Sequence, residues 1–256
     1  MQIYYLLKSI FTFFVMLFHI ISDFEGIMIN PANGKMEFHW ISGNQEVQAG
    51  FHSAGFAIHQ MGGEWEANPE IWDYVNYVGH KIASVSDRPD LPFDFVIVND
   101  SKPNAMCLPG GIILISTGML LELQSEAELA AILSHEIGHA SARHCARGIE
   151  RQWLYDLANE IFGSLPRWIG LGKTRKEELE ADYLGMEYMA RAGYDVKAVL
   201  SIAERNKNVD EWEFFKSHPS SLTRFQANSN HTVKLPSGGE WGFEQYQITL
   251  KKLREG

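Results

Sequence analysis

The spacing of apolar positions predicts a mainly helical chain with a small sheet in its first half. Apolar residues recur at helical spacing in several segments, which are 42–61, 69–82, 125–147, 174–192, 195–206 and 243–253. Two short apolar runs, FDFVIV at 93–98 and GIILIS at 111–116, have the length and composition of strands. Because the strands are grouped and the helices are segregated from them, we predict an α+β fold with a small mixed sheet.

Capping residues mark the ends of the predicted helices. Ser42 and Ser125 are suitable N-caps, and Glu128 completes a capping-box pattern with Ser125. The helix that begins after Ser125 is rich in alanine and is predicted to continue to Arg147 or beyond. Gly193 fits the position that follows the end of a later helix. The apolar face predicted for the first helix consists of Val47, Phe51, Ala54 and Ile58.

The N-terminal segment differs in character from the rest of the chain. Residues 3–21 are almost wholly apolar, and their length of about 19 residues is near the minimum for a membrane span. Lys8 and the run after it also fit a signal peptide, although no clear cleavage site follows. An uncleaved anchor, a cleaved signal and a buried helix therefore remain open. We divide the chain into an anchor or signal at 1–22, a linker at 23–41 and one domain at 42–256. An uncleaved anchor or a cleaved signal would place this domain outside the cytoplasm.

Charge and cysteine content narrow the possible functions. The formal net charge of −10 argues against a nucleic-acid partner, because such a partner requires a basic surface. The two cysteines, Cys107 and Cys145, form no C-x-x-C pair, so neither a redox motif nor a thiolate zinc site is indicated. We expect both thiols to be buried and free.

The stretch ILSHEIGHASARH at 132–144 contains a candidate metal site. His135 and His139 are four residues apart, so on a helix they lie one turn apart and both imidazoles reach one ion. Glu136 lies on the adjacent surface, where it is placed to take a proton from a metal-bound water. The flanking residues are small and apolar, which predicts a buried helix. Buried histidines and a buried glutamate need partners, and a metal ion supplies one.

A third ligand on the same helix is excluded by counting. A metzincin has glycine and then histidine three and six residues after the second histidine, whereas this chain has Ala142 and Cys145 there. His144 is nine residues beyond His135, which places it on the opposite face of a continuous helix. We therefore expect His144 to be a structural residue that binds backbone or a carboxylate.

Two carboxylates remain as candidates for the third ligand. Glu160 lies 21 residues after the second histidine, at a spacing close to that of thermolysin-like sites. Glu178 lies on a later helix, and Asp182 shares its face and is placed to hold the far nitrogen of a bound histidine. Glu180 is predicted to face away from them. Two histidines, one carboxylate and an open fourth position form the catalytic zinc pattern, and these ligand types favour zinc over calcium or magnesium.

Several motifs together resemble one peptidase family. NAMCLPGGIILISTGML, SEAELAAILSHEIGHASARH, RKEELEADYLGMEYMARAGYD and SHPSSLTR occur in the order found in the gluzincin peptidases that include HtpX and the CAAX prenyl endopeptidases. The chain is most similar to their periplasmic branch, of the BepA and LoiP type. The resemblance implies a zincin-type domain with one Zn²⁺ per chain, held by His135, His139 and Glu178. It further implies that Glu136 is the catalytic base and that Asp182 supports a zinc-bound histidine.

The resemblance also implies a substrate cleft. His218 and Arg224 belong to the H-P-x-x-x-x-R motif and are implied as catalytic residues beside the cleft, one of them stabilising the oxyanion. Alternatively, His218 blocks the metal in a resting state. The residues implied to bind substrate are Asn104, Ala105, Gly110, Gly111, Ile112, Ile113 and Leu114. We expect an extended polypeptide to add to Ile112–Ile115 as a further strand at the edge of the sheet, with weak sequence preference.

The family resemblance leads to two functional hypotheses. The first is a zinc endopeptidase that cleaves unfolded or misassembled cell-envelope proteins at the periplasmic or extracytoplasmic face of the inner membrane, held there by residues 3–21 if these are uncleaved. The second is a zinc-bound chaperone or adaptor with weak or latent proteolysis. The chain departs from its relatives in a short gap between His139 and Glu178, and it has no four-span pattern, no tetratricopeptide pattern after residue 230 and no lipobox.

Overall fold

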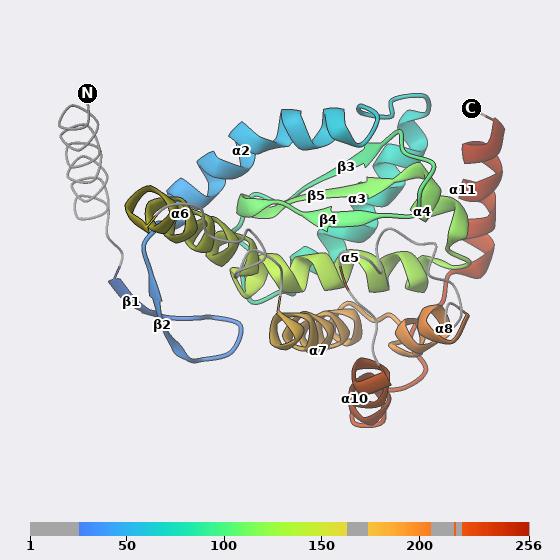
Figure 1. Cartoon of the computed structure of the whole chain (residues 1–256). Coiled ribbons are helices and arrows are strands. Elements are labelled where there is room, and N and C mark those ends of the chain that lie inside the picture. Colours follow the sequence, from blue (N-terminus) through green and yellow to red (C-terminus); the bar gives the residue numbers. More distant parts are fainter. Residues whose placement is uncertain (1–25, 163–173, 206–217, 219–221, 256) are drawn as a thin grey trace.

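The computed structural model describes residues 26–162, 174–205, 218 and 222–255 (Figure 1). Its helices are α2 (Gly43–Gln60), α3 (Pro69–Ala83), α4 (Thr117–Glu122), α5 (Glu126–Ser141), α6 (His144–Phe162), α7 (Arg175–Arg191), α8 (Lys197–Arg205), α10 (Leu222–Thr232) and α11 (Phe243–Glu255). Its strands are β1 (Gly26–Ile29), β2 (Met36–His39), β3 (Asp94–Val98), β4 (Ala105–Cys107) and β5 (Ile112–Ser116), and a 3-10 turn, η1 (Pro109–Gly111), precedes β5. The predicted α+β fold is confirmed.

The apolar run at 3–21 lies outside the described residues. Among the helices that the structure does describe, none has the length and apolar character needed to cross a bilayer.

The three-stranded sheet is mixed, as predicted. Its order is β3-β5-β4, with β3 parallel and β4 antiparallel to β5. β5 is therefore the central strand, and its backbone groups are already paired on both sides. The prediction that a substrate adds to Ile112–Ile115 is wrong for this reason, and the edge beside the long helix α5 is β4 instead. β4 was not recognised from sequence because it is only three residues long and lies between two proline-containing turns.

The sheet packs between helices on both faces. Alternate residues of β3 and β5, which point to one side, join a core with α3 and α5; these are Phe95, Ile97, Ile113 and Ile115. The intervening residues pack under Ala54, Ala57 and Ile58 of α2; these are Val96, Val98, Ile112 and Leu114. Phe51, predicted on the buried face of α2, is instead 60% exposed, because the face of α2 that packs on the sheet is formed by Ala54, Ala57 and Ile58.

α5 is the centre of the domain, and all of its residues are buried. Its partner on the side away from the sheet is α7, which lies alongside it in Figure 1. Glycines allow the two helices to approach closely. A Cβ atom on Gly138 would lie 2.7 Å from the carbonyl oxygen of Ala181, and one on Gly185 would lie 3.1 Å from the backbone nitrogen of His135. This close approach brings the acidic residues of α7 up to the histidines of α5.

The segment expected to be a linker contains a β-hairpin. β1 and β2 pair antiparallel, with Ile27 opposite Phe38 and Ile29 opposite Met36. The intervening turn is closed by backbone hydrogen bonds between Asn30 and Lys35 and between Gly34 and Asn30. The sequence signal was weak because each strand has only four residues. The hairpin is attached to the domain at the end where α6 lies (Figure 1).

Candidate metal centre

Four buried side chains from separate parts of the chain meet at one point. His135 and His139 come from α5, Glu178 comes from α7, and His218 lies just before α10. One ligand atom from each lies within 4.8 Å of all the others. The Nε2 atoms of His135 and His139 are 3.1 Å apart, and they lie 3.6 and 3.4 Å from the Glu178 carboxylate oxygens. The Nδ1 atom of His218 lies 3.1 Å from His135 Nε2 and 3.0 Å from Glu178 Oε2.

This donor set fits zinc. Zinc prefers imidazole nitrogen and carboxylate oxygen in a tetrahedral arrangement, and bonds of about 2.1 Å give ligand-to-ligand separations of about 3.4 Å. The five separations given above fall between 3.0 and 3.6 Å. The four groups are also buried, so without an ion several polar atoms would share a small space removed from water. Three residues predicted as ligands from sequence, His135, His139 and Glu178, are thus brought together, and His218 joins them.

Asp182 lies one turn after Glu178 on α7 and faces His135. Its Oδ1 atom is 2.9 Å from Nδ1 of His135, which leaves the Nε2 atom of that ring turned toward the group. Arg224 donates two hydrogen bonds to the Asp182 carboxylate, at 2.8 and 2.7 Å, and Asn228 donates a third at 3.2 Å. Arg224 therefore holds carboxylates, and it also lies 3.1 Å from Glu178.

The charges of the group are interdependent. Burial disfavours the carboxylate form of Glu178, but its contacts with His135, His139 and His218 outweigh burial and hold its pKa well below the usual range. Burial also disfavours a charged His135, yet the hydrogen bonds to Asp182 and Glu178 prevail and raise the pKa of His135 to about 9. Both shifts have the same cause, which is that the carboxylates of Glu178 and Asp182 favour a positive charge at this point.

His144 occupies a position that differs from the prediction. α5 ends at Ser141, and Arg143 has a positive φ of 58°, so the chain turns before α6 begins at His144. This break returns His144 to the same side as His139, and their Nδ1 atoms are 2.7 Å apart. The helix was predicted to continue to Arg147 because its alanine-rich sequence contains no glycine or proline at the break.

Glu180, predicted to face away from Glu178 and Asp182, contacts His144 and the hairpin turn. Its carboxylate lies 3.1 Å from Nε2 of His144 and accepts a hydrogen bond of 2.7 Å from Asn33 in the hairpin turn. The prediction that His144 binds a carboxylate is therefore confirmed, whereas its placement away from the metal group is wrong. Neither contact was visible in sequence, because both depend on the turn at Arg143 and on the folded hairpin.

Glu136 is fully buried on α5, beside the group. Its Oε1 atom lies 3.4 Å from Nε2 of His218, whose opposite nitrogen faces Glu178. His218 thus lies between the acid predicted as catalytic base and the acid predicted as ligand.

The predicted substrate-binding residues divide into two sets. Asn104 and Ala105 lie at the start of the edge strand β4, next to α5. Gly110 and Gly111 lie in η1, and a Cβ atom on Gly110 would come within 2.6 Å of Val47 in α2, so this turn is packed against a helix. Ile112, Ile113 and Leu114 lie in the buried central strand. Their strand is paired on both sides, so these three residues cannot receive a substrate as an additional strand.

A buried H-E-x-x-H helix, a mixed sheet with an antiparallel edge strand beside it, and a carboxylate from α7 define a zincin-like metallopeptidase domain. A sequence profile of peptidase family M48 matches residues 72–165 and 159–232. The chain belongs to this family, whose metallopeptidases depend on zinc. The predicted family resemblance is confirmed.

Similar proteins include enzymes of mitochondria and bacteria. The chain is 35% identical over 158 residues to the mitochondrial metalloendopeptidase OMA1 of Arabidopsis thaliana, which covers 56% of this chain and 32% of that protein. It is 32% identical over 170 residues to OMA1 of Schizosaccharomyces pombe, and this match covers 60% of this chain and 50% of that protein. It is 29% identical over 177 residues to a putative beta-barrel assembly-enhancing protease of Vibrio cholerae, and this match covers 60% of this chain and 36% of that protein. The matches thus span between about a third and a half of these relatives.

Proposed function

We propose that this protein is a zinc-dependent endopeptidase that hydrolyses peptide bonds of unfolded or misassembled cell-envelope proteins. The observation that supports this most strongly is the convergence of His135, His139 and Glu178 next to the buried carboxylate of Glu136. Membership of family M48 supports the same chemistry. The Vibrio cholerae relative is described as a putative beta-barrel assembly-enhancing protease, which supports envelope proteins as the substrate class.

Each residue of the site has a distinct task in this proposal. When bound, zinc supplies a Lewis acid that polarises the scissile carbonyl and lowers the pKa of a water molecule. His135, His139 and Glu178 hold the ion, and Asp182 keeps the hydrogen of His135 on Nδ1 so that Nε2 is free for it. Glu136 accepts the proton of the attacking water at its carboxylate and then delivers that proton to the leaving nitrogen.

Substrate binding is assigned to the edge strand β4. Its neighbour β5 occupies one side only, and β4 lies against α5, which carries the histidines. An extended polypeptide that pairs with Ala105–Cys107 would be held through backbone groups. Such binding requires an unfolded segment and discriminates little between side chains, which suits a protease that removes misassembled proteins.

The position of His218 supports a resting state with low activity. Its Nδ1 atom completes the group of four donors, and its Nε2 atom lies beside Glu136, so it takes the place that a water molecule needs. We assign cleavage to a state in which His218 has moved away. Arg224 donates to the backbone carbonyl of His218 at 3.0 Å and therefore fixes the segment that holds it.

Residues 3–21 are proposed to attach the chain to a membrane, with the domain on the extracytoplasmic side. Their apolar character and length support this assignment. Flotation of the full chain with lipid vesicles would test the attachment, and N-terminal sequencing of the exported protein would show whether the segment is retained.

The decisive experiment compares Glu136→Gln with the wild type in a casein cleavage assay with zinc analysis. We expect the variant to lose cleavage and to retain about one zinc per chain, because Glu136 is a base and not a ligand. Glu244→Gln, at an exposed site on α11, is the matched control and should cleave normally. A chelator should abolish wild-type activity and added zinc should restore it. Cleavage that survives in Glu136→Gln would disprove the mechanism and favour the alternative of a zinc-bound chaperone or adaptor.

A further inference from the structure

The β1–β2 hairpin directs its apolar side chains outward. Ile27 and Ile29 are 72% and 65% exposed, and their cross-strand neighbours Phe38 and Met36 are 53% and 77% exposed. Alternate residues of a strand point to opposite faces, so these two cross-strand pairs form one continuous surface, which we call the hairpin patch. Contiguous exposed apolar surface on a domain indicates an interaction site, whereas single exposed apolar residues do not.

The opposite face of the hairpin is polar and is bound to the domain. Glu37 accepts a hydrogen bond of 2.6 Å from Arg147 on α6, and His39 lies 3.4 Å from Glu150 on the same helix. Asn30 donates to the carbonyl of Ala142 at 3.2 Å. These contacts fix which face of the hairpin is turned inward. The outward position of the hairpin patch is therefore a consequence of specific polar contacts.

The place of the hairpin in the sequence indicates what covers the patch. Gly26, its first residue, follows the apolar run at 3–21 after residues 22–25 only. Five peptide steps span at most about 17 Å, and the headgroup layer on each side of a bilayer is about 5–8 Å thick. If residues 3–21 are embedded in a membrane, as proposed above, the hairpin cannot lie far from its surface.

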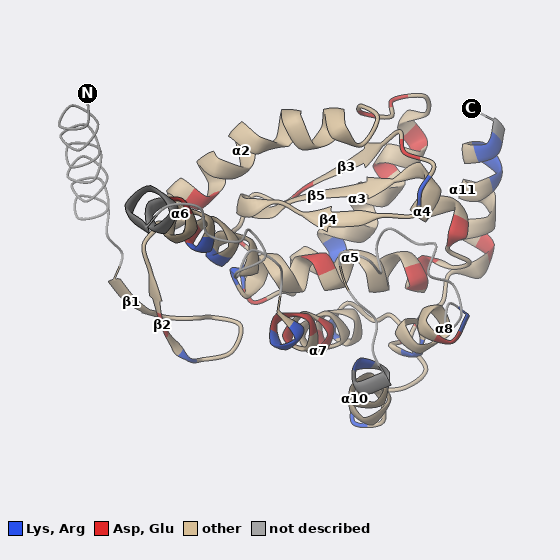
Figure 2. Ribbon diagram, in the orientation of Figure 1, with Lys and Arg blue, Asp and Glu red and all other residues tan. Residues whose placement is uncertain are grey.

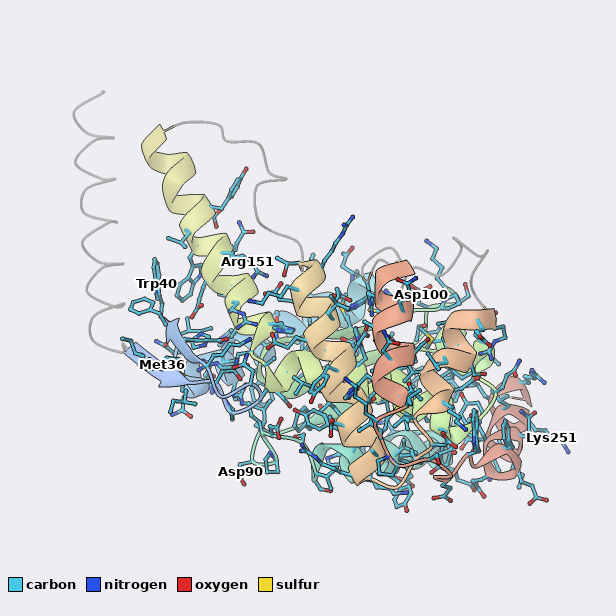
Figure 3. The ribbon with its side chains drawn as sticks, turned by 90° about the horizontal axis from the view of Figure 1, so that it is seen from below. Met36, Trp40, Asp90, Asp100, Arg151 and Lys251 are labelled. Atoms are coloured by element: carbon cyan, nitrogen blue, oxygen red, sulfur yellow. The ribbon has the colours of Figure 1, made fainter. Side chains whose placement is uncertain are left out.

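We propose that the hairpin patch inserts into the headgroup region of the membrane as a second, interfacial contact beside the segment 3–21. Trp40 supports this assignment, since it follows β2 directly and packs edge-on against Phe38 with ring centroids 6.1 Å apart. Aromatic residues are favoured at the level of lipid headgroups. Met36 and Trp40 lie together at one end of the molecule, whereas Lys251 of α11 lies at the other (Figure 3).

The contact is apolar and not electrostatic. From Gly26 to His39, Lys35 and Glu37 are the only residues among Lys, Arg, Asp and Glu (Figure 2). Glu37 points inward to Arg147, and His39 is buried beside Glu150. The net charge of the chain, −10, disfavours attraction to anionic lipid. Zwitterionic lipid should therefore suffice, and salt should have little effect.

Site-specific fluorescence in vesicles tests the proposal. The full chain with Cys107→Ser and Cys145→Ser would carry a single NBD label at Met36→Cys, and a matched protein would carry the label at Ile248→Cys on α11, which is 50% exposed. Both proteins would be reconstituted in phosphatidylcholine vesicles, and retention of zinc would confirm folding. For the Met36 position we expect a blue-shifted emission, quenching by lipids that carry a shallow nitroxide, and a several-fold loss of quenching by iodide in the aqueous phase.

The possible results separate the hairpin contact from the membrane attachment. In one result the protein floats with the vesicles while iodide quenches the labels at positions 36 and 248 equally. This result would overturn the proposed hairpin contact and leave the membrane attachment standing. Protection from iodide without quenching by the nitroxide lipid would also overturn the hairpin contact. In that case protein would cover the patch, and the covering segment would be either residues 3–21 or a second copy of the chain. Failure to float would refute the attachment and the hairpin contact together. Equal quenching in vesicles with and without phosphatidylglycerol would support an apolar contact, and a requirement for the anionic lipid would contradict it.

Discussion

The Nδ1 atoms of His139 and His144 lie 2.7 Å apart, although the two residues belong to different helices. Since Nε2 of His139 faces the metal group, its Nδ1 atom carries the hydrogen and donates it to His144. His144 must then accept at Nδ1 and keep its own hydrogen on Nε2, which faces Glu180 at 3.1 Å. Burial lowers the pKa of His144, in agreement with a neutral ring. The outcome is a chain of hydrogen bonds that fixes the orientation of His139.

Replacing His144 with alanine should weaken zinc binding. Residues that orient a metal-bound histidine commonly contribute about 10- to 100-fold in metal affinity, and we expect a loss within that range. Competition with a chromogenic chelator measures it. Glu180→Gln should have a smaller effect, since its amide oxygen still accepts from His144. An unchanged zinc affinity in His144→Ala, with wild-type zinc binding confirmed in parallel, would show that the contact has no role in orientation.

Zinc affinity should rise with pH up to about 9. In the metal-free chain the pKa of His135 is raised to about 9, so below that pH the imidazole binds a proton that zinc must displace. The proton thus competes with the metal at neutral pH and is absent above the raised pKa. Calorimetry in buffers of different ionisation enthalpy should detect proton release on zinc binding at neutral pH. Asp182→Asn removes one cause of the raised pKa and should reduce this release, whereas an affinity independent of pH between 6 and 9 would contradict the prediction.

Gly138→Ala should disturb the metal centre through packing alone. The added Cβ atom would lie 2.7 Å from the carbonyl oxygen of Ala181, so α5 and α7 must separate. Overpacking of this kind costs about 1–3 kcal/mol of unfolding free energy, and we expect weaker zinc binding with it. The control is Gly55→Ala, at an exposed helical site with no atom within 4 Å of the new Cβ, which should stabilise by about 0.4–1 kcal/mol. Thermal unfolding and zinc titration of both variants decide the outcome.

His218→Ala should increase the rate of casein cleavage if His218 closes the site at rest. Its removal frees the position between Glu136 and Glu178 for water, and the other donors still hold zinc. The double variant His218→Ala with Glu136→Gln should not cleave casein. Its inactivity would show that the increased cleavage in His218→Ala takes place at the metal centre with Glu136 as the base. A large decrease in the rate, with zinc retained, would instead support the alternative in which His218 assists the reaction.

The sequence alone determined much of the helical framework. Ser42 and Ser125, the two predicted N-caps, cap α2 and α5, and Gly193 has the positive φ of 86° expected after a helix. The capping box predicted at Ser125 is only half formed, because Glu128 accepts from the backbone N–H of Gln124. These features depend on residues close together in the chain, so local rules predict them. The H-E-x-x-H motif is local in the same sense, because a four-residue spacing on one helix fixes where His135 and His139 point.

Contacts between distant segments required the tertiary structure. Whether β5 was an edge or a central strand depended on β4, whose three residues carry too weak a pattern to be recognised. The position of His144 depended on one residue, Arg143, adopting a left-handed conformation, and local propensity favours a continuous helix there. Likewise, the direction of the hairpin patch was set by ion pairs with α6, which lies more than a hundred residues later. Local sequence fixes which residues share one face of an element, but only packing against other elements decides what that face meets.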